Sequence, residues 1–151
     1  MTTVKEVMMS EVTSVTLSTP VVEVAQRMKM SSTSTIPVCE NGKFRGIITE
    51  RDIVIGIVAT GRDPGATPAS SVMSKDLPTI SPNDDLWKAV NVMADRGIKV
   101  LPVVQDGKLV GLLSLDDLTK KSPALAAMVF SRSISSRRVT PHSTLGKGDP
   151  R

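Results

Sequence analysis

Short apolar runs and amphipathic stretches follow one another along the first half of the chain, each with the spacing of a regular element. Apolar and polar residues alternate over residues 12–15, which is typical of a short strand. Val21, Val24 and Met28 recur at helical spacing after a helix-start signal that ends in Pro20. The pattern predicts a strand, a helix, two strands and a helix, at residues 12–15, 21–28, 35–39, 44–49 and 50–60.

The same order of elements returns 65 residues later without a gap. A strand at 77–80 precedes a helix that Gly97 ends, and two further strands follow at 100–104 and 109–113. In both halves a Gly-apolar-apolar-hydroxyl-x-x-Asp segment precedes the last helix, at residues 46–52 and 111–117. Because an internal repeat indicates a duplicated structural unit, the sequence predicts an α/β (α+β) fold of two tandem β-α-β-β-α repeats.

Domain boundaries follow from the repeat and from local composition. We expect a first repeat, a flexible Gly- and Pro-containing connector, a second repeat, and a short helix with a basic tail, at residues 1–61, 62–68, 69–121 and 122–151. The apolar residues of that last helix lie within 124–130. From residue 131 onward few apolar residues remain, so we expect the tail to be disordered.

Composition narrows the function classes. The 151 residues include one Trp, two Phe and no Tyr, which argues against a base-stacking surface for single-stranded nucleic acid. Residues 1–119 carry 12 Lys and Arg against 14 Asp and Glu, and residues 120–151 carry 7 against 1, so the basic charge belongs to the tail. Cys39 is the only cysteine, expected to be a small buried hydrophobe, and no apolar run is long enough to span a membrane. These features favour a reducing, cytoplasmic location.

The repeated segment before the last helix allows two interpretations. Thr49 and Asp52, like Ser114 and Asp117, have the spacing of a capping box, in which a hydroxyl and a carboxylate satisfy each other's free backbone N–H groups. A cap alone does not require the glycine three residues upstream, inside a strand, where glycine marks the close approach of a ligand or another backbone. A carboxylate is also suited to hold two vicinal ribose hydroxyls. Both interpretations can hold for the same strand end.

Taken together, the motifs resemble the CBS-domain pair, a family named for cystathionine β-synthase. The resemblance covers residues 4–120 and rests on an apolar-Pro-apolar strand, a Gly-containing turn and the Gly-to-Asp segment, at residues 36–38, 41–42 and 46–52 and again at 101–103, 106–107 and 111–117. It implies two repeats packed about a pseudo-twofold axis with two clefts between them. It also implies a stand-alone, non-catalytic regulatory module that binds AMP, ADP, ATP or S-adenosylmethionine, needs no other cofactor, and signals to a partner protein.

Each cleft would take the hydroxyl and the Asp from one repeat and an adenine pocket from the other. The residues that the resemblance assigns to the first cleft are Ile47, Thr49, Asp52, Met73, Pro78, Ile98 and Lys99. Those of the second cleft are Leu112, Ser114, Asp117, Met8, Thr13, Thr33 and Ser34. Lys99 and Arg51 are cationic, so we expect the first cleft to be the tighter site for di- and triphosphates. The second should accept adenosine ligands with little negative charge.

Other function classes have less support. The single histidine, His142, lies in the tail, so a histidine-based triad or a multi-histidine metal site is not available, and we expect no catalytic or metal-binding residues. The alternative is an adaptor with empty clefts, tethered to nucleic acid or acting structurally through the basic tail, whose polyanion binding would weaken steeply with salt. The last helices and residues 124–130 would present an apolar face, so a homodimer is expected.

Overall fold

The order of elements follows the pattern of apolar positions. The computed structural model describes the backbone of residues 1–139 and the side chains up to Arg132. Its elements are η1 (Val4–Glu6), α1 (Val21–Ser31), β1 (Thr35–Glu40), β2 (Lys43–Thr49), α2 (Glu50–Ile53), η2 (Val54–Val58), η3 (Ala69–Ser71), α3 (Leu86–Arg96), β3 (Val100–Gln105), β4 (Lys108–Ser114), α4 (Leu115–Lys121) and α5 (Pro123–Val139). The π-helical turn η2 continues α2, so the predicted helices and both predicted hairpins are present.

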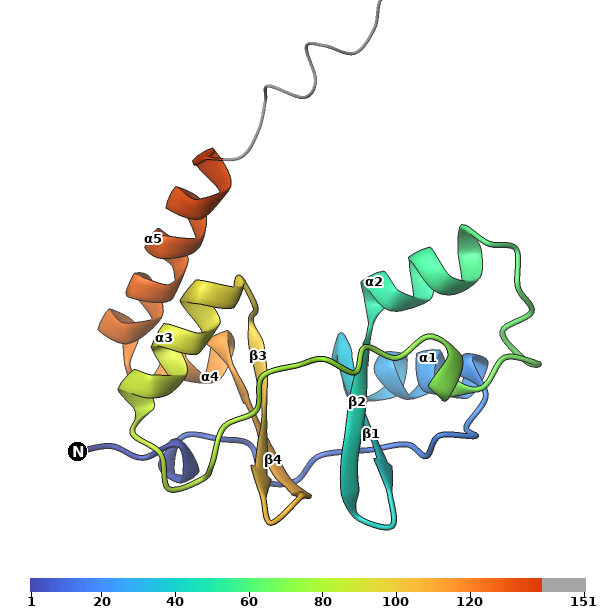
Figure 1. The fold of residues 1–151 in the computed structure, drawn as a ribbon, viewed down its shortest axis with the longest axis horizontal. Helices are drawn as coiled ribbons and strands as arrows, with labels where there is room; N and C mark the ends of the chain where they lie inside the picture. The colour runs from blue at the N-terminus through green and yellow to red at the C-terminus, as the bar shows by residue number, and fades with distance from the viewer. Residues whose placement is uncertain (140–151) are drawn as a thin grey trace, which may run out of the picture.

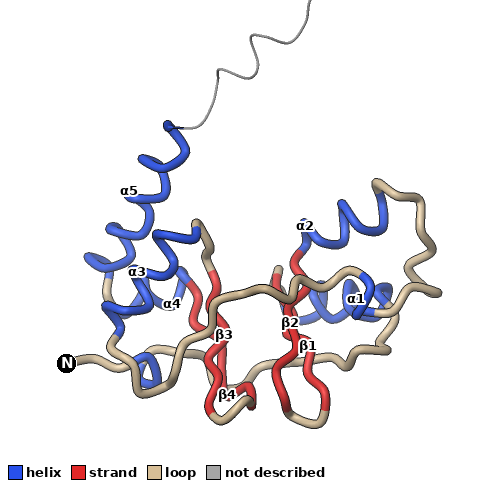
Figure 2. Tube along the Cα trace, viewed as in Figure 1, coloured by secondary structure: helices blue, strands red, loops and turns tan. Residues whose placement is uncertain are grey.

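Two β-hairpins stand side by side at the centre of the molecule, each with its own helices beside it (Figures 1 and 2). β1 pairs with β2 and β3 with β4, both antiparallel. Both turns need two left-handed residues in a row, which Asn41-Gly42 (φ 52° and 83°) and Asp106-Gly107 (φ 54° and 79°) supply. A single residue pair, Lys43 with Lys108, joins the hairpins into a sheet of order β1-β2-β4-β3. The hairpins therefore diverge from their turns and leave space between two lobes. The first lobe contains β1, β2, α1 and α2, and the second lobe contains β3, β4, α3, α4 and α5.

The first strand predicted for each repeat is reduced to one bridging residue. Val15 forms a parallel bridge to Val38, and Ile80 forms the equivalent bridge to Val103. Val15 donates to the carbonyl of Pro37 and accepts from Cys39. Pro37 has no N–H, so it cannot donate a hydrogen bond to the segment that precedes Val15. The strand pairing therefore ends at Val15. The prediction of strands at 12–15 and 77–80 was therefore wrong in length and right in position.

The two hydrophobic cores do not coincide with the two repeats. Val4 and Val7, from the start of the first repeat, are buried in the core built by α3, β3, β4 and α4. Ala69, from the start of the second repeat, is buried in the other core, with Val72 and Met73 packed against it. Figure 1 shows the N-terminal segment beside α3 and the η3 segment beside α1. Each lobe is thus completed by the first segment of the other repeat.

The connector between the repeats is fixed in place, although its composition predicts flexibility. Thr67 is only 5% exposed, and its Oγ1 donates to the carbonyl of Asp63 at 2.7 Å. Its own carbonyl accepts from the N–H of Val21 at 2.9 Å, and the carbonyl of Pro64 accepts from Val22. These bonds satisfy the free N–H groups at the start of α1, which Pro20 cannot cap with a side chain. The segment 62–68 therefore caps the N-terminus of α1.

Helix α5 lies across α3 and α4 and is longer than predicted (Figure 1). Ala126 and Val129 are buried against the second lobe, while Phe130 remains 59% exposed. The expected apolar face of 124–130 is therefore used in part within the chain itself, while Ala124, Ala127, Met128 and Phe130 remain exposed. The helix is drawn as far as Val139, past residue 131 from which disorder is expected, and residues 140–151 lie outside the described part, so the disorder of the tail stays a prediction. Among the described residues, no helix is long and apolar enough to cross a membrane.

Candidate functional site

The glycine in each repeated segment lies where the other repeat crosses the strand. Ile47 and Ser74 exchange two backbone hydrogen bonds of 2.8 and 3.1 Å, and Met9 and Leu112 exchange two of 2.8 and 3.0 Å. A Cβ on Gly46 would lie 2.5 Å from the carbonyl oxygen of Ser74, closer than real Cβ contacts. Of the two explanations that the sequence left open, the close approach of another backbone is the one that the structure supports.

Both capping boxes predicted from the sequence are formed. In the first, the Thr49 N–H donates to Asp52 Oδ2 at 2.8 Å, and the Asp52 N–H donates to Thr49 Oγ1 at 3.1 Å. In the second, Asp117 Oδ2 accepts from the Ser114 hydroxyl at 2.8 Å, and the Asp117 N–H donates to Ser114 Oγ at 3.0 Å. A carboxylate that caps with one oxygen keeps its second oxygen for another partner. Each cap therefore fixes the position of its Asp through Oδ2 and leaves Oδ1 available for another hydrogen bond.

The second cleft exists as a cavity of about 410 Å³ between the two lobes. Its wall includes Leu112, Ser114 and Asp117 from the second repeat together with Thr13, Thr33 and Ser34 from the first. Met8, the seventh predicted residue, is placed differently, because its sulfur packs against Gly111 and its neighbour Met9 reaches the cavity instead. The remaining wall residues, which sequence reasoning missed although they neighbour predicted positions, are Glu11, Val12, Ser31, Ser32, Thr35, Val100, Asp116 and Lys120.

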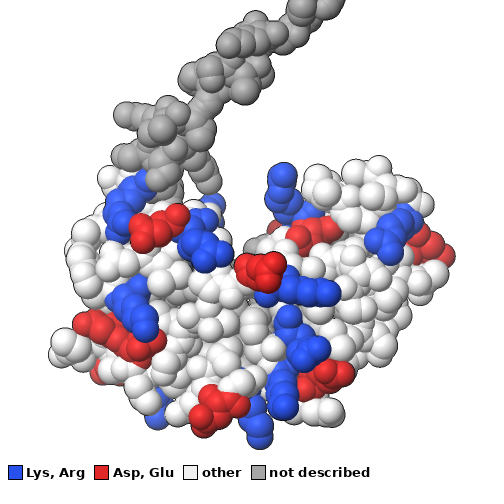
Figure 3. Space-filling model, in the orientation of Figure 1, with Lys and Arg blue, Asp and Glu red and all other residues white. Residues whose placement is uncertain are grey.

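The electrostatic character of this cavity is acidic. Glu11, Asp116 and Asp117 line it with one cation, Lys120, so its titratable wall carries a net charge of −2. Hydroxyls of Thr13, Thr33 and Ser34 add uncharged donors and acceptors, and Leu112 and Val100 add apolar surface. Over the face drawn in Figure 3, Lys and Arg lie interspersed with Asp and Glu on both lobes. The acidic lining of the cavity wall disfavours strongly anionic ligands.

The first cleft has a different arrangement. Thr49, Asp52 and Ile47 lie together at the end of β2, with the sulfur of Met73 packed against Gly46. The hydroxyl of Ser74 donates to Asp52 Oδ1 at 3.2 Å, a contact that the motif did not predict. Ile98 is half-buried against the second core, Pro78 is half-buried, and Lys99 is exposed. Their assignment to an adenine pocket stays a prediction.

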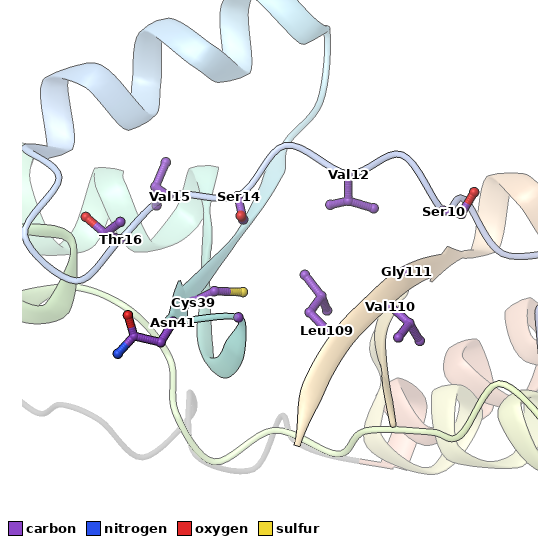
Figure 4. Close-up of a pocket in the computed structure, with 11 residues that line it drawn as sticks. Ser10, Val12, Ser14, Val15, Thr16, Cys39, Asn41, Leu109, Val110 and Gly111 are labelled. Atoms are coloured by element: carbon purple, nitrogen blue, oxygen red, sulfur yellow. The ribbon is translucent and has the colours of Figure 1, made fainter. Parts of the chain in front are cut away.

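A smaller cavity of about 300 Å³ lies under the segment 10–16, between the turn of the first hairpin and β4. Figure 4 shows Cys39, Leu109 and Val12 pointing into this space. Burial raises the pKa of the Cys39 thiol, and a hydrogen bond with Ser14 opposes that rise. A raised pKa keeps a thiol in its unreactive form at neutral pH. Cys39 therefore behaves as the small apolar residue expected from the sequence, although it is only half-buried.

Comparisons with known proteins agree with this geometry. The family model for the CBS domain matches the chain twice, at residues 4–59 and 69–124. The CBS domain-containing protein YhcV of Bacillus subtilis is 41% identical over 118 residues, which cover 78% of this chain and 84% of that protein. Hypoxic response protein 1 of Mycobacterium tuberculosis is 28% identical over 137 residues, which cover 90% of this chain and 96% of that protein.

Solved structures superpose on the same region. The crystal structure of Hypoxic Response Protein I with two coordinated zinc ions has a TM-score of 0.73 at 28% identity, covering 79% of this chain and 98% of its own. The CBS domain pair of protein MJ0100, in complex with 5′-methylthioadenosine and S-adenosyl-L-methionine, has a TM-score of 0.71 at 20% identity, covering 80% and 94%, and so shares the fold. With two matched repeats, two capped Asp residues and this fold, the chain belongs to the CBS-domain family as a tandem pair.

Proposed function

We propose that this protein is a non-catalytic regulatory module that binds an adenosine-containing ligand in the cleft of Ser114 and Asp117. The observation that supports it is the cavity of about 410 Å³, whose wall combines Ser114 and Asp117 with hydroxyls from the other lobe. Its size falls within the range of small-molecule sites, about 300–1,000 Å³. The fold accommodates 5′-methylthioadenosine and S-adenosyl-L-methionine in the protein MJ0100. For this chain, ligand and site are our proposal.

Each side chain of the cleft has a role that its chemistry suits. Asp117 is held by its cap through Oδ2, so Oδ1 can accept hydrogen bonds from the two ribose hydroxyls. Leu112, Val12 and Val100 offer apolar surface to the adenine ring. Because the wall carries three carboxylates and one Lys, adenosine or a cationic derivative such as S-adenosylmethionine should bind more tightly here than ATP. This agrees with the expectation that the second cleft accepts ligands with little negative charge.

Signalling would follow from the position of the cleft between the lobes. Thr33 and Ser34 belong to one lobe, and Ser114 and Asp117 belong to the other. A ligand that bonds to both sides stabilises one relative arrangement of the lobes over others, and a partner protein can read that change. The alternative is an adaptor acting on nucleic acid through the basic tail. Four of the seven cationic residues of segment 120–151 lie beyond Arg132, where the side chains are outside the described part, and the adaptor stays a prediction.

Binding of four probes tests the proposal: adenosine, AMP, ATP and S-adenosylmethionine. Thermal-shift screening comes first, and calorimetry follows on the wild type and on Asp117→Asn. The substitution keeps an oxygen for the helix cap and removes the charge that holds the ribose, so affinity should fall about tenfold or more. Asp106→Asn, in the turn between β3 and β4, is the matched control and should bind as the wild type does. Equal affinity in Asp117→Asn and the wild type would refute this site.

A further inference from the structure

One difference between the two clefts lies at a pair of equivalent positions, Met9 and Ser74. Met9 and Ser74 are 65 residues apart, the repeat distance, and each forms the antiparallel bridge to the strand that carries a capped Asp. Ser74 bridges to Ile47 in the first cleft, and Met9 bridges to Leu112 in the second. The backbone therefore delivers a hydroxyl to one cleft and a thioether side chain to the other. A hydroxyl can donate a hydrogen bond to a carboxylate, and a thioether cannot.

The consequence appears in the hydrogen bonds of the two carboxylates. Asp52 is bonded through both oxygens: Oδ2 accepts from the Thr49 N–H at 2.8 Å, and Oδ1 accepts from the Ser74 hydroxyl at 3.2 Å. Asp117 accepts only through Oδ2, from the Ser114 hydroxyl at 2.8 Å and the Ser114 N–H at 3.3 Å. Within residues 1–132, its Oδ1 has no protein donor. One ribose acceptor is thus occupied by the chain itself, and the other is open.

We infer that Ser74 is a built-in competitor for the ribose site of the first cleft, so that a nucleoside fills the second cleft first. This rests on the proposed function and deepens it by ranking the two sites and naming the residue that ranks them. The order is opposite to the one expected from Lys99 and Arg51, which concerns phosphate groups. For a ligand held through its ribose, the Ser74 hydroxyl must first be displaced from Asp52.

The geometry also sets the strength of this competition. The Ser74 to Asp52 distance of 3.2 Å is longer than the usual 2.5–2.7 Å of a hydroxyl bonded to a carboxylate. Ser74 is half-buried and its hydroxyl can rotate away, so a ligand can displace it. The contact therefore weakens binding in the first cleft without closing it. We expect the first cleft to bind adenosine about tenfold more weakly than the second.

Methionine side chains beside each cleft make the order of filling measurable. Met73 packs against Gly46, next to Ile47 of the first cleft, and Met8 packs against Gly111, next to Leu112 of the second. With ¹³C-methyl methionine in the full chain, an adenosine titration followed by NMR reports each cleft separately. Adenosine is chosen because it is uncharged, so Lys99 and the acidic wall of the second cleft contribute little. In the wild type, Met8 should respond at about tenfold lower adenosine concentration than Met73.

Reciprocal substitutions test whether Ser74 is the cause of the weaker adenosine binding in the first cleft. In Ser74→Ala, the Met73 midpoint should move about tenfold lower while the Met8 midpoint stays fixed. In Met9→Ser, the Met8 midpoint should move higher, because the second cleft gains a hydroxyl at the equivalent place. Ser71→Ala, an exposed serine of the same segment, is the control, and thermal unfolding checks that all variants are folded.

The outcomes separate this inference from the proposed function. Responses from both methionines with an unchanged Met73 midpoint in Ser74→Ala would overturn the role of Ser74 and leave the ligand site standing. A wild type in which Met73 responds before Met8 would overturn the order of filling. No response from either methionine, in the wild type or in any variant, would refute the adenosine site and the inference together.

Discussion

At the scale of single residues, the two strand glycines have a structural role that leads to a prediction. Gly46 and Gly111 let the opposite repeat cross the strand, and a Cβ there would lie 2.5 Å from the Ser74 carbonyl oxygen or 2.7 Å from that of Met9. Backbone must move to relieve such an overlap, so Gly46→Ala and Gly111→Ala should each lower the free energy of unfolding by about 1–3 kcal/mol. Urea denaturation measures this loss.

Gly65→Ala is the matched control for both glycines. A Cβ on Gly65 would meet only Asp63 Oδ1, at 3.4 Å, which is an ordinary contact. Its free energy of unfolding should stay within about 0.5 kcal/mol of the wild type. If Gly46→Ala were as stable as this control, the crossing backbone would be able to shift away from the added Cβ. The close contact would then not be the reason that glycine is needed at that position.

At the scale of elements, the exchange of first segments couples the two lobes. Val4 is fully buried in the core of the second lobe, although it opens the first repeat, and its N–H donates to the backbone carbonyl of Asp84 at 2.9 Å. Val4→Ala should therefore destabilise the protein by roughly 2 kcal/mol. Amide hydrogen exchange should show the loss of protection concentrated in β3 and β4. Lys5→Ala, an exposed neighbour, is the control. Loss of protection mainly in β1 and β2 would contradict the assignment of Val4 to the core of the second lobe.

At the scale of the whole molecule, α5 makes the two lobes unequal. It covers the face of α3 and α4, whereas in the first lobe Val54, Ile55 and Val58 are from 51% to 71% exposed. Val54 also lines a groove of about 600 Å³ between α1 and α2. Because a monomer would leave these neighbouring apolar side chains in water, we propose that a second copy of this chain covers them, in a homodimer with the same patch on both sides.

Charge on this patch tests the homodimer. Val58→Glu should shift the protein to the monomer in sedimentation or light-scattering measurements, because an isologous interface would bury two carboxylates close together. Phe130→Glu, on the exposed side of α5, is the matched variant and should leave the dimer intact. A dimer that survives Val58→Glu and dissociates in Phe130→Glu would place the interface on α5 instead.

Residue spacing along the chain is enough to predict the local features of this protein. The helices, both hairpins and both capping boxes depend on residues within a few positions of one another, so their pattern predicts them directly. Six of the seven residues assigned to the second cleft also lie together. Spacing alone does not predict this, because the family resemblance supplied the rule that the hydroxyl and Asp of one repeat face residues of the other. Where the prediction failed, as in the strands at 12–15 and 77–80, a proline on the neighbouring strand ended the ladder.

Tertiary structure alone decided the features that join distant residues. The exchange of Val4 and Ala69 between the cores depends on how two similar apolar segments choose between two similar lobes, and the pattern of either segment fits both. The contact of Ser74 with Asp52 spans 22 residues and exists only because the crossing backbone fixes where that side chain lies. A sequence specifies which surfaces are apolar and which groups can bond. Which partner each one meets is set by the packing of the whole chain.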